Sequence, residues 1–148
     1  MKPKRNVLFL CTHNSARSQM AEAFLRRYGG GHFNAYSAGL EPTEIDPMTR
    51  EVMREVGIDL EGQYAKGLKT YLGRLMVNHL IIVCEAAGRN CPRTWPGLEI
   101  EERLLWPFDD PAEAQGSREE KLQTFRRIRD QVERQVKSWV EEVSRKGV

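Results

Sequence analysis

A cysteine and an arginine, Cys11 and Arg17, bracket a short polar loop near the start of the chain. The loop follows an apolar run at residues 7–10 and precedes a helical pattern. A loop that opens a helix presents unpaired N–H groups and the positive end of the helix dipole, both of which attract anions. Arg17 can add a bidentate guanidinium contact to two oxygens of the same anion. The pattern therefore predicts an oxyanion-binding loop formed by Thr12, His13, Asn14, Ser15, Ala16, Arg17 and Ser18.

The same positive surroundings would favour the thiolate form of Cys11. Thiols in such places have a pKa lowered from about 8.5 to about 3.5–7.5. The alternative is a small buried hydrophobic residue at the end of a strand, because a cysteine six residues before an arginine is weak evidence alone. The transition from apolar strand to helix favours the functional interpretation, in which Cys11 is a nucleophile for a tetrahedral oxyanion.

Apolar runs of strand length alternate with helical patterns along the chain. Strands are expected at residues 7–11, 33–38, 79–84 and 100–106, and helices at residues 17–28, 48–56, 68–75 and 122–143. Alternating strands and helices form parallel sheets with right-handed crossovers. We expect one α/β domain over residues 1–148, a three-layer fold with a four-stranded parallel sheet flanked by helices. Ligands of such sheets bind beyond the carboxyl ends of the strands, which is where Cys11 lies.

Length, charge and composition exclude several classes of protein. The chain has 148 residues and a formal net charge of +2, with both signs interspersed, which argues against nucleic-acid or membrane partners. The apolar stretch at the N-terminus is too short for a signal peptide, and no segment is long enough to span a membrane. An odd number of cysteines, 3, indicates reactive thiols rather than a disulfide framework. We expect a cytoplasmic monomer.

Two further cysteines, Cys84 and Cys91, are separated by six residues. If the strand ending at Cys84 lies beside the first strand, Cys84 emerges at the same rim as Cys11. A relay of thiol–disulfide exchange among the three then becomes possible. The alternative is a core residue and an incidental surface thiol. The spacing is not that of paired zinc-binding CxxC motifs, so no metal is expected.

Several segments together resemble the thioredoxin-coupled arsenate reductases, which are related to the low-molecular-weight protein tyrosine phosphatases. They are CTHNSARSQMAE at residues 11–22, SAG at residues 37–39, the cysteines at 84 and 91, and WPFDDPA at residues 106–112. The resemblance spans nearly the whole chain. The Cys-to-Arg loop alone implies only the wider phosphatase-like superfamily, whereas the later cysteines and the Asp-Asp-Pro loop imply the reductase branch.

The resemblance implies a mechanism without a bound cofactor. Cys11 attacks arsenate while Arg17 and the loop amides hold the oxyanion, and Asp110 protonates the leaving oxygen. Cys84 then attacks Cys11, releases arsenite and leaves a disulfide. Cys91 attacks Cys84 and moves the disulfide to a loop, where thioredoxin reduces it. The neighbouring Asp109 is the less favoured candidate for the acid.

The resemblance also concerns the residues behind the loop. Relatives hold a potassium ion with residues that match Asn14, Glu22 and Ser37, plus an acid at the position of Lys66. The lysine departs from that pattern, and its ammonium could replace the cation, so we expect no potassium dependence. The alternative is that Lys66 is a solvated surface charge. His13 is a further departure and could tune Cys11.

Other functions are compatible with the same loop. A low-molecular-weight protein tyrosine phosphatase would use Cys11, Arg17 and Asp110 without redox chemistry, and weak phosphatase activity is expected in either case. A non-catalytic oxyanion-binding module would need only the loop. The Cys84–Cys91 pair discriminates in favour of a reductase, because a hydrolase does not require it. Spacing alone does not decide between thioredoxin and glutaredoxin as the electron donor.

Overall fold

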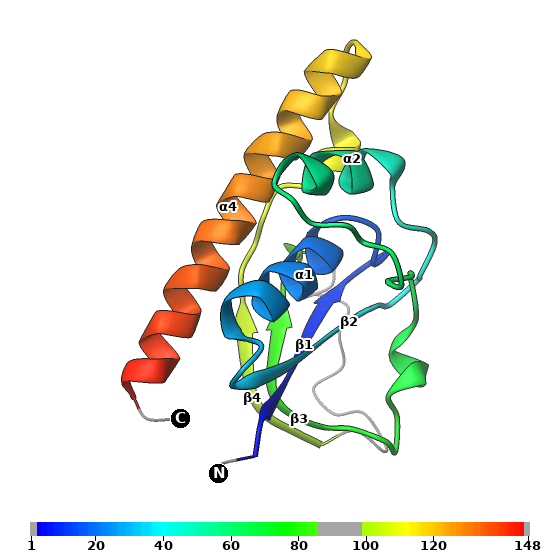
Figure 1. Ribbon diagram of the computed structural model, residues 1–148. Helices are drawn as coiled ribbons and strands as arrows, with labels where there is room; N and C mark the ends of the chain where they lie inside the picture. Colours follow the sequence, from blue (N-terminus) through cyan, green and yellow to red (C-terminus); the bar gives the residue numbers. More distant parts are fainter. Residues whose placement is uncertain (1–2, 86–98, 147–148) are drawn as a thin grey trace.

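The computed structural model describes residues 3–85 and 99–146, which form a parallel sheet with helices packed on it (Figure 1). The strands are β1 (Arg5–Cys11), β2 (Phe33–Gly39), β3 (Met76–Ile82) and β4 (Glu99–Leu105). The helices are α1 (Arg17–Gly29), α2 (Pro47–Glu55) and α4 (Arg118–Arg145), with short 3₁₀ helices η1 (Leu68–Thr70) and η2 (Pro111–Glu113).

The four strands pair in the order β2-β1-β3-β4, and all of the pairs are parallel. The expected four-stranded parallel sheet and the α/β class are confirmed. β1 lies inside the sheet, and its residues from Val7 to Leu10 are fully buried, as an apolar run covered on both faces should be. Leu10 pairs with Ile82 of β3, and Cys11 pairs with Gly39 of β2. The rim beyond β1 is therefore bordered by the ends of both neighbours.

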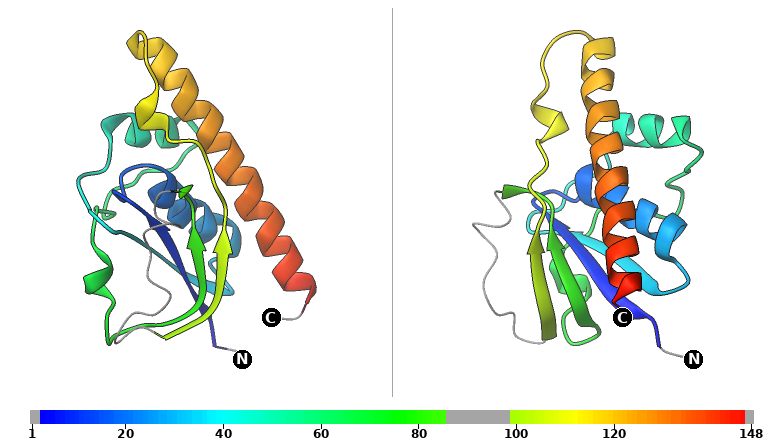
Figure 2. Two further views of the ribbon diagram at one scale, coloured as in Figure 1. Left: turned by 180° about the vertical axis from the view of Figure 1, so that it is seen from behind. Right: turned by 90° about the vertical axis from the view of Figure 1, so that its left-hand side faces the viewer.

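Helix α4 is the longest element and lies across one face of the sheet, packed against α1 (Figure 2). It begins with a capping box in which Ser117 and Glu120 satisfy each other's backbone N–H groups. Its buried stripe has helical spacing and consists of Leu122, Phe125, Ile128, Val132, Val136, Trp139, Val140 and Val143. The expected C-terminal helix is confirmed. Helix α2 packs on the same helix, starts at an Asp46 cap followed by Pro47, and ends before Gly57, whose φ is 80°.

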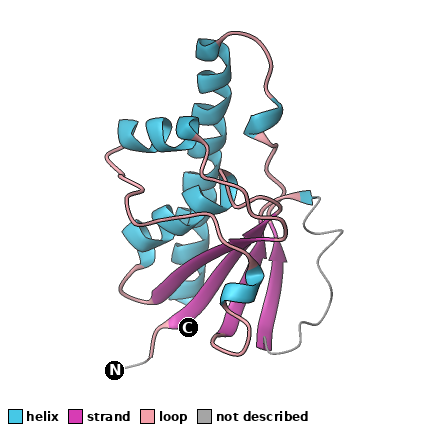
Figure 3. Cartoon of the chain, turned by 90° about the vertical axis from the view of Figure 1, so that its right-hand side faces the viewer, coloured by secondary structure: helices cyan, strands magenta, loops and turns pink. Residues whose placement is uncertain are grey.

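Residues of the η1 region cover the opposite face of the sheet at β2. Ser37 points toward α1, so its neighbour Tyr36 points to the other face, where its ring lies 5.4 Å from that of Tyr71. η1 and its flanking loop lie in front of the strands, with α4 behind them, in Figure 3. No helix in the described ranges is long and apolar enough to span a membrane.

Two of the expected elements differ from the structure. The helix expected at residues 68–75 is wrong, because only η1 is helical there and Gly73 follows with a φ of 72°, which ends regular structure. The third strand runs from Met76 to Ile82 rather than from 79 to 84, so Cys84 lies two residues beyond its end. This shift arises because β3 also pairs with β4, starting at Met76 opposite Glu99.

Candidate active site

The segment between β1 and α1 folds into a compact loop whose carbonyl oxygens are held by the chain that follows β2. The N–H groups of Leu40, Glu41, Thr43 and Asp46 donate to the carbonyl oxygens of Cys11, Thr12, His13 and Ser15, respectively. Carbonyl groups fixed in this way on the outside of a loop are what an inward-facing nest of amides requires. The N-terminus of α1 follows at Arg17 and adds the positive end of its dipole.

Gly39 makes this loop geometry possible. A Cβ atom at that position would lie 2.7 Å from the carbonyl oxygen of Thr12 and 2.9 Å from the backbone nitrogen of Asn14. Only a residue without a side chain allows the loop backbone to approach β2 so closely. The glycine of the SAG segment at residues 37–39 thus lies directly against the oxyanion loop.

Asn14 is the one non-glycine residue with positive φ, 55°, in the described part of the chain. It is fully buried, and its side chain donates to Ser18 and accepts from the backbone N–H of Lys66. Asparagine tolerates the left-handed region better than most residues, and hydrogen bonds at both ends of its amide fix it there.

The sulfur of Cys11, the last residue of β1, lies beside that of Cys84, which follows the end of β3 by two residues. Both cysteines are buried, with 3% and 2% of their surface exposed. The Cys11 thiol hydrogen-bonds to Cys84, whose sulfur is also 3.5 Å from the hydroxyl oxygen of Thr12. The structure thus brings together the first two thiols of the expected relay.

The ionisation of Cys11 differs from the expectation. Its hydrogen bond to Cys84 and its burial raise the pKa of the thiol, and this outweighs the lowering by the Arg17 guanidinium and the Thr12 backbone. Two buried sulfurs in contact do not both ionise readily, because a second charge would meet repulsion and little solvent. This raised pKa is opposite in direction to the lowered pKa expected from the field of the loop alone.

Arg17 connects the loop to the segment that carries the aspartates. Its Nη1 donates to the carbonyl oxygen of Phe108 at 2.9 Å, and its Nη2 lies 3.7 Å from Oδ1 of Asp110. Asp110 also accepts from the N–H of Ala112 and so caps η2. Asp109 instead points outward, with 81% of its side chain exposed and Arg127 at 3.8 Å. Of the two candidate acids, Asp110 is the one beside Arg17.

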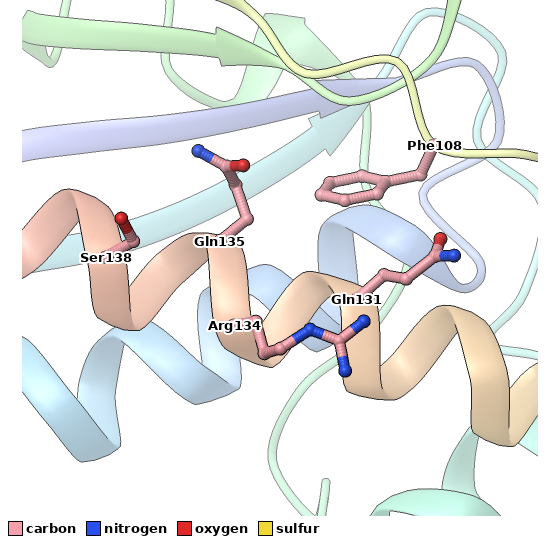
Figure 4. Close-up of a pocket in the computed structure, with 5 residues that line it drawn as sticks. All are labelled: Phe108, Gln131, Arg134, Gln135 and Ser138. Carbon is pink, nitrogen blue, oxygen red and sulfur yellow. The ribbon is translucent and has the colours of Figure 1, made fainter.

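A cavity of about 390 Å³ opens over the loop and reaches both aspartates. Residues from three parts of the chain line it: Thr12, His13, Arg17, Cys84, Glu85, Phe108, Asp109, Asp110 and Glu113. Phe108 also lines a second cavity, of about 420 Å³, along α4. Figure 4 shows its ring extending over that helix beside Gln131. Phe108 thus contributes its backbone carbonyl to Arg17 and its side chain to the lining of the cavity along α4.

Glu22 and Ser37 lie behind the loop, as expected of supporting residues. The Glu22 carboxylate is buried, accepts a 2.7 Å hydrogen bond from the Ser37 hydroxyl and forms a 2.7 Å ion pair with Arg26. The ammonium of Lys66 lies 3.9 Å from the same carboxylate and donates to the carbonyl oxygen of Tyr64 at 2.9 Å. Only 9% of the lysine side chain is exposed, so it is no solvated surface charge.

These contacts do not fit a potassium ion. A potassium ion would need the oxygen atoms of Glu22 and Tyr64 as ligands. The Lys66 ammonium already lies beside the Glu22 carboxylate and donates to the Tyr64 carbonyl oxygen. Burial lowers the pKa of Lys66 while Glu22 opposes that effect. In the described ranges, no cluster of three or more His, Cys, Asp or Glu side chains is arranged to hold a metal.

Two expected residues remain, His13 and Cys91. His13 is exposed, and its Nδ1 lies 3.0 Å from the carbonyl oxygen of Glu41. Cys91, the third thiol of the relay, lies outside the described residues.

Two residues with clear roles in the geometry were not expected from the sequence, namely Gln19 and Phe108. Gln19 shares its face of α1 with Glu22 and Arg26, so the sequence pattern carries no signal that Gln19 is buried.

The sheet, the β1–α1 loop and the Cys11–Arg17 pair define an α/β protein with a cysteine-based oxyanion site. The sequence profile of the low molecular weight phosphotyrosine protein phosphatases matches residues 6–148. This chain belongs to that family.

Individual relatives of the chain carry narrower names than the family as a whole. An arsenate reductase from Halalkalibacterium halodurans is 38% identical over 138 residues, which cover 93% of this chain and 96% of the relative. The structure of an arsenate reductase in the phosphate binding state superposes with a TM-score of 0.76 at 32% identity, covering 93% of this chain and 98% of that one. A thioredoxin-dependent arsenate reductase from Corynebacterium glutamicum superposes with a TM-score of 0.65 at 26% identity, covering 96% of this chain and 64% of that one.

Proposed function

We propose that the chain reduces arsenate to arsenite through a relay of Cys11, Cys84 and Cys91, with thioredoxin as the external reductant. The observation that carries this proposal is the contact between the buried sulfurs of Cys11 and Cys84 at the oxyanion loop. A phosphatase of the same family needs only the first sulfur. The relatives of this chain that are named arsenate reductases support the proposal. Among them are one described in the phosphate binding state and one described as thioredoxin-dependent.

In the first step, arsenate occupies the cavity above the loop, held by the loop amides and Arg17. The Cys11 thiol passes its proton to the dianionic substrate, and the sulfur forms a bond to arsenic. One arsenate oxygen leaves as water with a proton from Asp110, which lies beside Arg17 at the rim of the cavity. Arsenic is still pentavalent in the resulting thiol adduct.

In the second step, the Cys84 thiolate attacks the Cys11 sulfur, a disulfide forms and the sulfur–arsenic bond breaks. The electron pair of that bond stays on arsenic, which leaves as trivalent arsenite. Because the two sulfurs are already in contact, this step needs little movement of β1 or β3. Cys91 then attacks Cys84, frees Cys11 and forms the disulfide that thioredoxin reduces. This electron supply fits a cytoplasmic protein.

The test is arsenate-dependent oxidation of NADPH in the presence of thioredoxin and thioredoxin reductase. We expect turnover by the wild type and none by Cys11→Ser, Cys84→Ser or Cys91→Ser. Mass spectrometry after arsenate treatment should find a Cys11–Cys84 disulfide in Cys91→Ser. Hydrolysis of phosphate esters by the wild type without arsenate-dependent turnover, fully retained in Cys84→Ser and Cys91→Ser, would instead identify a phosphatase. Inertness of every protein toward both substrates would favour a binding module. Replacing thioredoxin with glutaredoxin tests the donor.

A further inference from the structure

Gln19 is a fully buried polar residue in the first turn of α1, with none of its surface exposed. Its Nε2 donates to the backbone oxygen of Asn14 at 3.0 Å, to the side-chain Oδ1 of Asn14 at 2.8 Å and to the backbone oxygen of Tyr64 at 3.0 Å. Its Oε1 accepts from Gln63 at 2.7 Å. One side chain therefore connects the helix, the oxyanion loop and the segment after α2.

These contacts meet at the strained point of the loop. Asn14 has the positive φ that turns the loop, and its side-chain oxygen receives Gln19 together with the backbone N–H of Lys66. Gln19 also donates to the Asn14 backbone oxygen, so it restrains the peptide plane between Asn14 and Ser15. The direction of that plane sets where the next amide N–H of the loop points.

We propose that Gln19 is a positioning residue for oxyanion binding, which holds Asn14 so that the loop amides converge on the anion. Gln19 does not line the cavity over the loop, and its side chain reaches that loop through its hydrogen bonds to Asn14, so its effect passes through Asn14. The inference rests on the proposed function only in that the loop binds a tetrahedral oxyanion.

Only an amide satisfies all of these partners. The two hydrogens of Nε2 serve three oxygens, one hydrogen being shared, while Oε1 takes the Gln63 donor. Leucine of similar size at this position would leave the Asn14 and Tyr64 oxygens without these donors. A glutamate at this position would, when ionised, place a carboxylate oxygen against the oxygens of Asn14 and Tyr64. When protonated, it would regain one O–H donor for them.

The experiment measures binding of inorganic phosphate to the reduced, full-length protein by titration calorimetry, with thermal unfolding in parallel. Gln19→Leu should bind phosphate about tenfold or more weakly, because small displacements of positioning groups have large effects. The matched control is Val136→Ala, a truncation in the α4 stripe that lowers stability through packing alone and should leave phosphate affinity unchanged. For Gln19→Glu, affinity relative to the wild type should recover as the pH falls, which a role in packing alone does not explain.

Three results would overturn the inference. They are a folded Gln19→Leu protein with wild-type phosphate affinity, an equal loss of affinity in an equally destabilised Val136→Ala, and a Gln19→Glu/wild-type affinity ratio that is independent of pH. The last measurement decides the matter if the leucine variant does not fold. Failure of the proposed function gives a different pattern, in which the wild type binds phosphate and Gln19→Leu does not, yet neither reduces arsenate.

Discussion

Replacing Cys84 should make Cys11 a stronger acid. The hydrogen bond to Cys84 is the largest cause that raises the pKa of Cys11, and burial is the next. In Cys84→Ala both the hydrogen bond and the repulsion between the sulfurs disappear, while Arg17 and the Thr12 backbone still stabilise the thiolate. The substitution removes only a thiol from the rim, so the loop and the sheet should keep their geometry.

The size of the effect follows from the kind of interaction lost. A hydrogen bond that involves a charged group contributes about 1.5–3 kcal/mol. One pKa unit corresponds to about 1.36 kcal/mol, so the pKa of Cys11 should fall by about one to two units. The assay is the pH dependence of Cys11 alkylation, resolved by mass spectrometry. It is made in a Cys91→Ser background, so that Cys11 is the last thiol in the double variant.

The same shift has a consequence for stability. The pKa of Cys11 is higher in the folded protein than in the unfolded chain. Its contribution to the free energy of unfolding is therefore fully present below about pH 8.5, the ordinary thiol pKa, and is lost as the pH rises above that value. The wild type should therefore lose stability in mildly alkaline solution more steeply than Cys84→Ala. An unchanged or higher pKa of Cys11 in Cys84→Ala would refute the conclusion that Cys84 raises this pKa, and so would equal alkaline profiles of stability.

Three further predictions concern the acid, the cation site and the approach of the loop. Asp110→Asn keeps the η2 cap but loses the proton, so arsenate-dependent turnover should fall about 10²-fold, while Asp109→Asn stays near the wild type in the same NADPH assay. Exchange of sodium for potassium at constant ionic strength should leave the melting temperature and the KM of the wild type unchanged. Lys66→Asp removes the ammonium beside Glu22, and this variant should become more stable in potassium. A potassium-dependent wild type would contradict this prediction. Gly39→Ala would press its Cβ against the Thr12 backbone, and calorimetry should show weaker phosphate binding; wild-type affinity would show that the loop can move aside.

The fold could be predicted because its main elements are strongly patterned locally. The apolar run of β1 and the stripe of α4 each suit one kind of structure. The boundaries of β3 could not be read in the same way, because the polar residues Asn78 and His79 interrupt its apolar pattern near the start. They are accommodated by partners on other strands, since His79 bonds to Arg5 of β1 and Glu102 of β4. Tertiary pairing, not local propensity, extends the strand to Met76.

The candidate site was predictable in its residues and less so in its interactions. Cys11, Arg17 and Asp110 have distinctive types at distinctive spacings. The structure places Arg17 and Asp110 in the lining of one cavity, and Cys11 contacts Cys84 of the same lining. Asp110 could be separated from Asp109 only through the contact with Arg17, which lies 93 positions away along the chain and depends on the path of the Trp106–Asp110 segment. Lys66 likewise became interpretable only through its 3.9 Å approach to Glu22.

The ionisation of Cys11 shows most clearly why a local field is insufficient. The helix dipole and Arg17 can be inferred from neighbouring residues, and both favour a thiolate. The opposing influence comes from the register of β1 and β3, in which Leu10 pairs with Ile82 and accepts the N–H of Val83, so that the chain delivers Cys84 to Cys11. A slip of one residue in that register would turn Cys84 to the other face of the sheet. The sheet therefore sets both the acidity of the nucleophile and the nearness of the thiol that follows it in the proposed relay.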